Sequence, residues 1–295
     1  MKRLYLIVLC LALLNVAQAQ KSNSKRKKPA AFNKQNNENQ SFLDKQWWLG
    51  FKAGVNLSGA TVTKRYGNVS PTNYSSTLTE KKYTNFKSLG VQAGIEITFF
   101  YKGVSIGIHP TYRNVQLEYS NHYAWTNVEN PNLYLERDFL QEMSMDYVDF
   151  PLIVKYNILN GKLKPYIQAG GYMSLLLNAT KSSTVTQLDR ASGGDNTIEY
   201  DPVIVGAKDL FAKNHWGLVG GVGVNYNLGN VRLNLDVQYK YGMSNISSTK
   251  ERDSSDKLSA MGDTLDDMTL NNLSLTVGCL FPLRFLTSGY KSIDK

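Results

Sequence analysis

The sequence has few of the residues that cross-link or interrupt a chain: two cysteines and eight prolines in 295 residues. Cys10 lies in an apolar N-terminal stretch that we expect to be removed, so Cys279 has no partner for an intramolecular disulfide or a cysteine-based metal cluster. Beyond that stretch no apolar run reaches the roughly 18 residues of a spanning helix. Such a chain can cross a bilayer only as a closed β-barrel, because backbone polar groups in lipid must be paired within the protein.

The central part of the chain also lacks net charge. Residues 46–282 hold 21 basic and 21 acidic residues, whereas residues 20–45 hold seven basic and two acidic ones. The overall charge of +9 therefore belongs to the ends of the chain. This distribution does not favour nucleic acid as a partner of the folded part.

The N-terminal region divides into two segments. Residues 1–19 have a basic start, an apolar centre and a small-residue end, which is typical of a secretory signal peptide. Residues 20–46 are polar and basic, and we expect a disordered periplasmic linker. Four consecutive cations in it are a candidate patch for partner proteins or anionic head groups, the alternative being a solvated linker: Lys25, Arg26, Lys27 and Lys28.

Residues 231–243 carry the strongest structural signal. Apolar residues occupy every odd position from Val231 to Met243, and polar residues or glycine occupy every even one. This period of two predicts a strand with one apolar and one polar face, and a helix would have no apolar stripe. The run is long enough for a tilted transmembrane strand, which needs about 9–11 residues.

The same alternation recurs along the chain and predicts an all-β fold, an eight-stranded antiparallel up-and-down transmembrane β-barrel over residues 47–282 with a C-terminal tail at 283–295. The expected strands are 47–58, 88–100, 104–119, one ending at 148–156, 163–178, 216–228, 231–243 and 270–281. Three connections are tight turns, at residues 101–103, 160–161 and 229–230. The other four are long and polar, which is typical of short periplasmic turns and long extracellular loops.

Two details of the expected strands are less regular. Pro110 and Pro151 fall inside expected strands, and each should mark a bulge or a local break because proline cannot donate to a ladder. The alternation also slips near Arg113 and Asn114, where we expect a bulge.

Ionisable residues on the inner face are expected to pair across neighbouring strands and fill the narrow lumen, and the alternative is an ion path or gated channel. They are Lys52, Glu96, Lys155, Arg232, Asp236 and Lys240. Aromatic residues near the turn ends are expected to form a girdle at the membrane interface. They are Trp47, Trp48, Tyr101, Tyr156, Tyr226 and Phe281.

Catalysis and cofactor binding have little support. His122, Ser120 and Asp138 share one expected loop, but three polar residues in a polar loop are ordinary. The aspartates of the last long loop match no calcium-loop spacing, so a solvated acidic loop is favoured. We expect no enzyme activity, no cofactor and no metal.

Three segments resemble the PorT-type outer-membrane barrel proteins of Bacteroidetes: WLGFKAGVN at 48–56, DYVDFPLIVKY at 146–156 and PYIQAGGY at 165–172. The resemblance implies an eight-stranded outer-membrane barrel without catalytic residues. Some members of that family are implicated in type IX protein secretion and gliding. The basic N-terminal extension and the dozen or so residues after Phe281 depart from a bare barrel.

These observations favour a non-enzymatic barrel in the outer membrane of a Gram-negative bacterium. It would be a structural or accessory subunit of an envelope assembly, with type IX secretion suggested by the resemblance. Its partners would be outer-membrane lipids, lipopolysaccharide and envelope or secretion-machinery proteins. The alternative is a stand-alone surface barrel whose loops bind an extracellular ligand or lipopolysaccharide.

Overall fold

The computed structural model describes residues 45–66, 81–159, 161–228, 231–250 and 265–283. The predicted signal peptide, the linker to residue 44 and the tail from residue 284 lie outside the described residues, as do Asn160, Gly229 and Asn230 of two predicted turns. The described part contains eleven β-strands and one short 3₁₀ helix, η1 (Lys208–Leu210). It contains no helix that is long and apolar enough to span a membrane.

The strands confirm the all-β antiparallel class but divide the chain more finely than expected. In order they are β1 (Lys45–Lys64), β2 (Lys82–Thr84), β3 (Leu89–Tyr101), β4 (Val104–Ile108), β5 (Thr111–Thr126), β6 (Tyr134–Asn157), β7 (Leu163–Asp189), β8 (Asn196–Gly206), β9 (Asn214–Leu228), β10 (Val231–Gly242) and β11 (Asp267–Pro282). The predicted third strand is two strands, and β2 and β8 lie where loops were expected.

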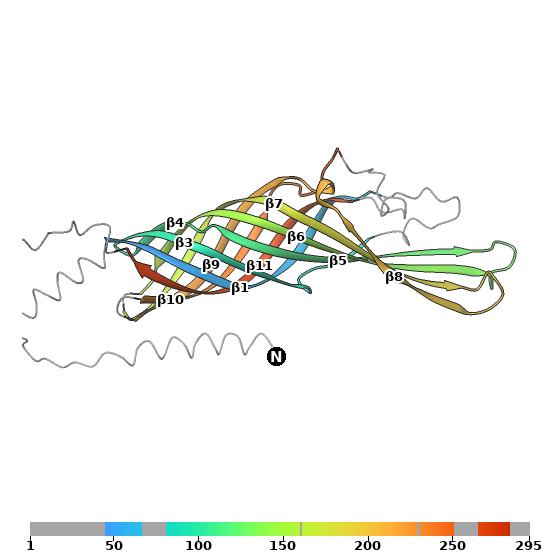
Figure 1. Cartoon of the computed structure of the whole chain (residues 1–295), viewed down its shortest axis with the longest axis horizontal. Coiled ribbons are helices and arrows are strands. Elements are labelled where there is room, and N and C mark those ends of the chain that lie inside the picture. Colours follow the sequence, from blue (N-terminus) through green and yellow to red (C-terminus); the bar gives the residue numbers. More distant parts are fainter. Residues whose placement is uncertain (1–44, 67–80, 160, 229–230, 251–264, 284–295) are drawn as a thin grey trace, which may run out of the picture. The chain divides into compact units, whose positions relative to one another are not determined.

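The strands pair in a closed circuit (Figure 1). β1 pairs with β3 and β11, and the circuit continues from β3 through β4 and β5 to β6, then β7, β9, β10 and back to β11. The β1–β11 register runs from Trp48 opposite Pro282 to Lys64 opposite Asp267. Closing the circuit pairs the backbone of the two strands that would otherwise be free edges. We call this circuit the ring.

The two faces of the ring differ in the way that the alternation predicts. On β10, Leu233, Leu235 and Val237 are 41–48% exposed, while Arg232 and Asp236 are at most 3% exposed. The side chains that point out of the ring are thus apolar, and those that point in are charged. Exposing so many apolar side chains to water would be costly, at roughly 25 cal/mol per Å² of apolar surface, so this outer face is suited to hydrocarbon.

A tight turn joins β3 and β4 at one end of the ring. β3 ends at Tyr101 and β4 begins at Val104, and between them Lys102 (φ 44°) and Gly103 (φ 92°) both have positive φ. This geometry matches the right-handed twist of the flanking strands and confirms the turn predicted at this place. We call this end of the ring the short-turn end and the opposite end the long-connection end.

Inside the ring the chemistry changes along the axis. Ionic and amide side chains fill the middle, and an apolar cluster fills the long-connection end. The buried members of this cluster are Ala60, Val115, Leu117, Tyr119, Met143, Met145, Tyr147, Leu176, Ala179, Ala207, Phe211, Ile246, Leu265, Met268 and Leu270. The predicted lumen was polar throughout, so the apolar cluster is a correction.

This change of chemistry also explains the bulge that was wrongly predicted near Arg113. The β5–β6 register is unbroken from Thr111 opposite Asp149 to Thr126 opposite Tyr134. Odd-numbered residues of β5 remain buried beyond Arg113, but they are now Val115, Leu117 and Tyr119. A slip was predicted because the inner-face residues change from polar to apolar. A period-two pattern looks the same whether the inner face becomes apolar or the strand changes face.

The two prolines act differently. Pro110 separates β4 from β5, yet both strands keep one register against β6, and the His109 N–H donates to the Pro151 carbonyl at 3.2 Å. Pro110 therefore causes a break without a bulge. Pro151 lies within β6, opposite Tyr172 of β7, so the strand continues through it.

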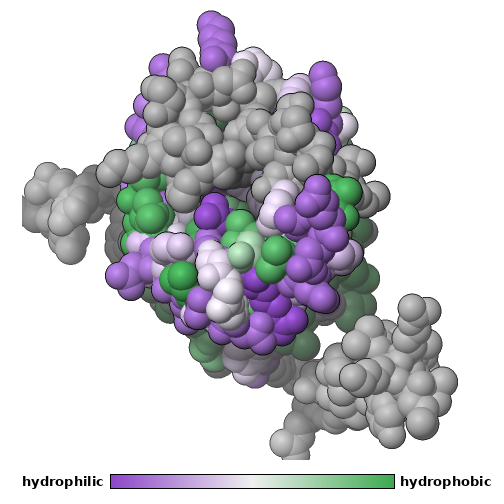
Figure 2. All heavy atoms as spheres, turned by 90° about the vertical axis from the view of Figure 1, so that its right-hand side faces the viewer, coloured by the Kyte–Doolittle hydropathy of each residue, from purple (hydrophilic) through white to green (hydrophobic). Residues whose placement is uncertain are grey.

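Beyond the ring, four strands continue as a projection at the long-connection end (Figure 1). β5 and β6 pair to Thr126 opposite Tyr134, and β7 and β8 pair to Asp189 opposite Asn196. We call residues 118–142 and 180–206 the blade. Two of the expected long loops are thus mostly strand, because each polar segment finds a backbone partner in its neighbour. Figure 2 looks at this end and shows mainly hydrophilic residues in front of hydrophobic ones on the ring.

The outer face of the ring predicts a position-dependent cost of charge. Leu235→Arg on β10 should lower the free energy of unfolding by about 2–4 kcal/mol in a bilayer, because the cation would enter hydrocarbon. Urea-induced unfolding in lipid vesicles measures this change.

Leu140→Arg on the blade is the matched control. Leu140 is 40% exposed, close to the 48% of Leu235, but we place it in water. Its variant should change stability by no more than about 0.5 kcal/mol. Equal losses for the two variants would contradict a lipid-facing ring.

Candidate functional site

Four of the six predicted inner charges meet in one cluster in the middle of the ring. Lys52 of β1 contacts both Glu96 of β3 and Asp236 of β10. Lys155 of β6 donates to Glu96 at 2.7 Å. All four side chains are at most 9% exposed. Because isolated buried charges are costly, two cations and two anions from four strands stabilise one another.

Neighbouring groups complete the hydrogen bonding of this cluster. The Thr98 hydroxyl donates to Glu96 at 2.9 Å, and His109 Nε2 lies 3.5 Å from the same carboxylate. The Gln168 amide donates to Asp236 at 3.3 Å. Gly223 provides the room, since a Cβ there would collide with both Tyr166 and Asp236.

A second ionic cluster lies around Asp149 of β6. Arg113 donates to it through Nε (2.7 Å) and Nη2 (3.1 Å), Ser174 donates at 2.6 Å, and Lys240 of β10 also contacts it. Lys240 was among the predicted charges, whereas Arg113 and Asp149 were missed. The alternation around Phe150 and Leu152 already puts Asp149 on the inner face, so the signal was present.

Arg232, the sixth predicted charge, joins neither cluster. Its guanidinium stacks 3.9 Å from the Trp48 ring centroid and 5.5 Å from that of Phe100, and its Nε donates to Asn227 at 2.8 Å. This stack closes the short-turn end of the lumen with a cation over aromatic faces.

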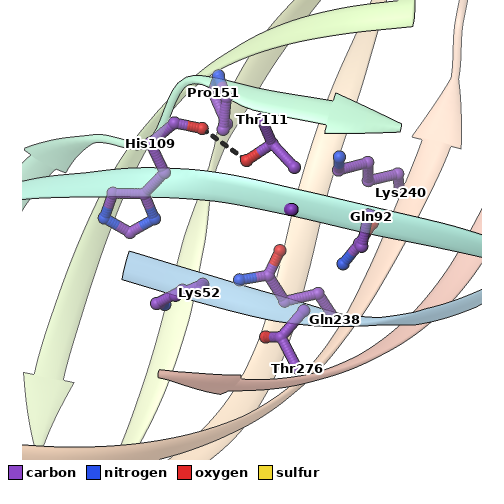
Figure 3. Close-up of a pocket in the computed structure, with 9 residues that line it drawn as sticks. Lys52, Gln92, His109, Thr111, Pro151, Gln238, Lys240 and Thr276 are labelled. Carbon is purple, nitrogen blue, oxygen red and sulfur yellow. Dashed lines mark hydrogen bonds between the residues drawn. The ribbon is translucent and has the colours of Figure 1, made fainter. Parts of the chain in front are cut away.

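A cavity of about 20 Å³ lies between the two ionic clusters (Figure 3). Lys52 and Lys240 border it on different sides, and Gln92, Gln238 and Thr276 also line it. Among the described residues, Gln92 Oε1 and Thr276 Oγ1 have no hydrogen-bond partner. A space of this size and polarity suits about one water molecule.

The predicted aromatic girdle needs one correction. Trp48 is 1% exposed and lies inside the ring under Arg232. Consecutive residues of a strand point to opposite faces, so Trp47 and Trp48 could not both face outward. The other five aromatics are on the outer face, 41–55% exposed: Trp47, Tyr101, Tyr156, Tyr226 and Phe281. The basic patch Lys25–Lys28 of the linker lies outside the described residues and remains a prediction.

The blade brings together two residues of the weakly supported catalytic group. His122 of β5 and Asp138 of β6 are directly opposite, and His122 Nδ1 lies 2.7 Å from Asp138 Oδ1. Ser120 precedes His122 by two positions, on the same face, opposite Leu140. The His122 side chain is 36% and the Asp138 side chain 69% exposed, so this is a surface pair on a strand pair, not a loop site.

The described part of the predicted acidic loop makes a structural contact. Asp266 is buried and accepts hydrogen bonds from the Tyr83 hydroxyl (2.9 Å) and from Lys81 (3.4 Å). Burial raises the pKa of Tyr83 and lowers that of Lys81. Asp253, Asp256 and Asp263 lie outside the described residues. Among the described residues there is no group of three or more metal-ligating side chains.

Comparison with known proteins identifies a family. Residues 18–248 match the family described as outer membrane protein beta-barrel domain. No curated protein matches the chain.

Solved structures similar to the chain include three outer-membrane or surface proteins. Neisserial surface protein A is 12% identical, with 79% of this chain and 96% of that chain covered and a TM-score of 0.30. The attachment invasion locus protein Ail of Yersinia pestis is 11% identical, with 80% and 99% covered and a TM-score of 0.24. Outer membrane protease OmpT from Escherichia coli is 11% identical, with 82% and 98% covered and a TM-score of 0.35.

The central ionic cluster predicts a large cost for removing one partner. Glu96→Gln should destabilise the protein by about 3–5 kcal/mol, because Lys52 and Lys155 would keep their charges with one carboxylate between them. Adding Lys155→Met to it should recover part of the loss. A double-mutant cycle of unfolding free energies measures the coupling.

Lys87→Met is the control for this experiment. Lys87 pairs with Glu118 at 2.9 Å, but its side chain is 63% exposed, so its loss should cost no more than about 1 kcal/mol. Additive effects of Glu96→Gln and Lys155→Met would show that the cluster is not a coupled unit.

Proposed function

This chain belongs to the outer membrane protein β-barrel domain family and resides in the outer membrane, and we propose that it is a non-enzymatic structural or accessory subunit of an envelope assembly. In this proposal the ring is an eight-stranded anchor with short periplasmic turns. The blade is the extracellular element that meets partner proteins. The observation that carries the proposal is the combination of a filled lumen with a strand-built projection at one end.

The filling of the lumen argues against a solute channel. Along the axis, the Trp48–Arg232 stack, the two ionic clusters and the apolar cluster follow one another. The cavity of about 20 Å³ between the ionic clusters suits about one water molecule. A chain whose interior is occupied in this way offers its outer surfaces, not its axis, for function.

The blade argues for binding over catalysis. It is an extension of paired strands beyond the ring, and strand pairing fixes the order in which its exposed side chains lie. The His122–Asp138 pair lies on its surface, where water screens it and no enclosure aligns a substrate. We therefore favour the non-enzymatic role.

The finer assignment rests on sequence motifs. We propose a PorT-type barrel of a Bacteroidetes bacterium, with type IX protein secretion as the envelope process it serves. The segments that carry this resemblance lie in β1, β6 and β7, of which β6 and β7 are neighbours in the ring. The second candidate is a stand-alone surface barrel that binds an extracellular ligand or lipopolysaccharide, favoured by the exposure of β8 on the blade.

Removing the blade tests the proposal. Residues 121–138 and 185–201 would each be replaced by an Asn-Gly turn, which suits tight hairpins. The shortened protein should still fold, seen as heat-modifiable migration on gels, but should lose its stoichiometric partners in mild-detergent co-purification. A full-length protein that purifies alone would favour the stand-alone barrel instead.

The basic patch Lys25–Lys28 is proposed as a separate, periplasmic contact. Deleting residues 22–34 should reduce recovery of periplasmic partners or binding to vesicles with anionic head groups, because the deletion removes five cations. Unchanged partners and unchanged vesicle binding would assign the segment to a solvated linker.

A further inference from the structure

The outer strand of the blade, β8, has a free edge. Of the described strands only β7 pairs with it, and it ends the order of the sheet. Every residue from Asn196 to Ile204 is exposed. A strand of eleven residues with one unpaired side presents a row of backbone donors and acceptors to solvent. Edges of this kind are where extended segments of other proteins add as a further strand.

The side chains of β8 are sorted in a way that suits such an addition. Ile198 lies opposite Gln187, Tyr200 opposite Val185 and Val203 opposite Ser183. These β7 residues are odd-numbered, so the three β8 side chains share one face of the blade. The register shifts between Ser183 and Val185, where two β8 residues lie opposite one β7 residue. That bulge keeps the apolar row on one face across it.

The bulge is also where the edge is protected. Asp201 and Pro202 lie in it, and charge and proline are the usual means by which proteins blunt an edge. The stretches on either side, residues 196–200 and 203–206, contain no proline and a single charged residue, Glu199. The protection is therefore local, and the two flanking stretches stay open to pairing.

Charge indicates what kind of segment fits. The blade holds nine acidic residues and three basic ones, and β8 itself carries Glu199 and Asp201 without a cation. Glu199 lies opposite Thr186, on the face away from Ile198 and Tyr200. A second copy of β8 paired in a register centred on Glu199 would bring carboxylate against carboxylate, which is unfavourable for directly opposed residues. A basic segment would instead find opposite charge on one face and apolar side chains on the other.

We propose that β8 accepts an extended segment of a basic partner protein as an added strand, a role that rests on the proposed function of the blade. The segment alternates apolar and basic residues. Its apolar side chains lie beside Ile198, Tyr200 and Val203, and its cations lie near Glu199. Backbone hydrogen bonds to the β8 edge bind the segment. Its alternation of apolar and basic residues matches the two faces of β8.

The test uses the full-length protein in lipid nanodiscs and a fluorescent ten-residue peptide of alternating valine and lysine. Fluorescence anisotropy measures binding, with empty nanodiscs as the blank, and hydrogen–deuterium exchange follows residues 196–206 and the hairpin at 127–133. We expect saturable binding that slows exchange in 196–206 at least fivefold and leaves 127–133 unchanged.

Two controls separate strand addition from nonspecific attraction. The same peptide with two N-methylated central residues keeps its charge but cannot form the ladder, and it should bind at least tenfold more weakly. Glu199→Lys should also weaken binding at least tenfold, whereas Glu129→Lys, the same charge change on an exposed residue of the blade, should stay within twofold.

Three results would overturn the inference: equal loss in the two variants, binding that leaves exchange in 196–206 unchanged, or slow exchange there without peptide because two copies pair. The blade-removal experiment distinguishes these from failure of the proposed function. If removing the blade abolishes partner recovery but Glu199→Lys does not alter peptide binding, only the β8 inference fails. If partner recovery survives removal of the blade, the proposed function fails.

Discussion

The architecture depends on one constraint: inside hydrocarbon, each backbone N–H and C=O must find its partner within the chain. Pairing of β1 with β11 meets it by leaving the ring without an edge. Once the ring is closed, alternate side chains of every strand are forced inward, into a space too narrow to leave empty. The apolar outer face and the crowded interior are therefore two results of the same closure.

The interior solves the filling problem in two ways. In the middle, cations and carboxylates from strands far apart in sequence neutralise one another, as Lys52 does with Glu96 and Asp236. At the long-connection end, the buried face of β6 that carries Asp149 continues with Met143, Met145 and Tyr147, which pack in the apolar cluster. The blade extends from this apolar end, so its base is supported by packing of the kind found in water-soluble domains.

The period-two pattern allowed the faces of β10 to be predicted, because alternation depends only on neighbouring residues. It also placed Lys52, Glu96, Lys155 and Asp236 on one face, though not their contacts. It failed where the outcome depends on pairing between strands. The blade was predicted as loop because its segments are polar, although residues 118–126 pair with 134–142. Trp48 was a different error, because alternation itself excludes two consecutive outward residues.

The apolar cluster separates the two ionic clusters from the medium at the end of the ring from which the blade projects. Water and protons arriving from that side meet methionine, leucine and aromatic side chains before any ionisable group of the central cluster. This apolar layer thus limits the access of water, ions and protons to the ionic clusters. A change in acidity on the side of the blade would reach Glu96 and its neighbours only when this packing opens, so the charge balance inside the ring is decoupled from the surroundings of the blade.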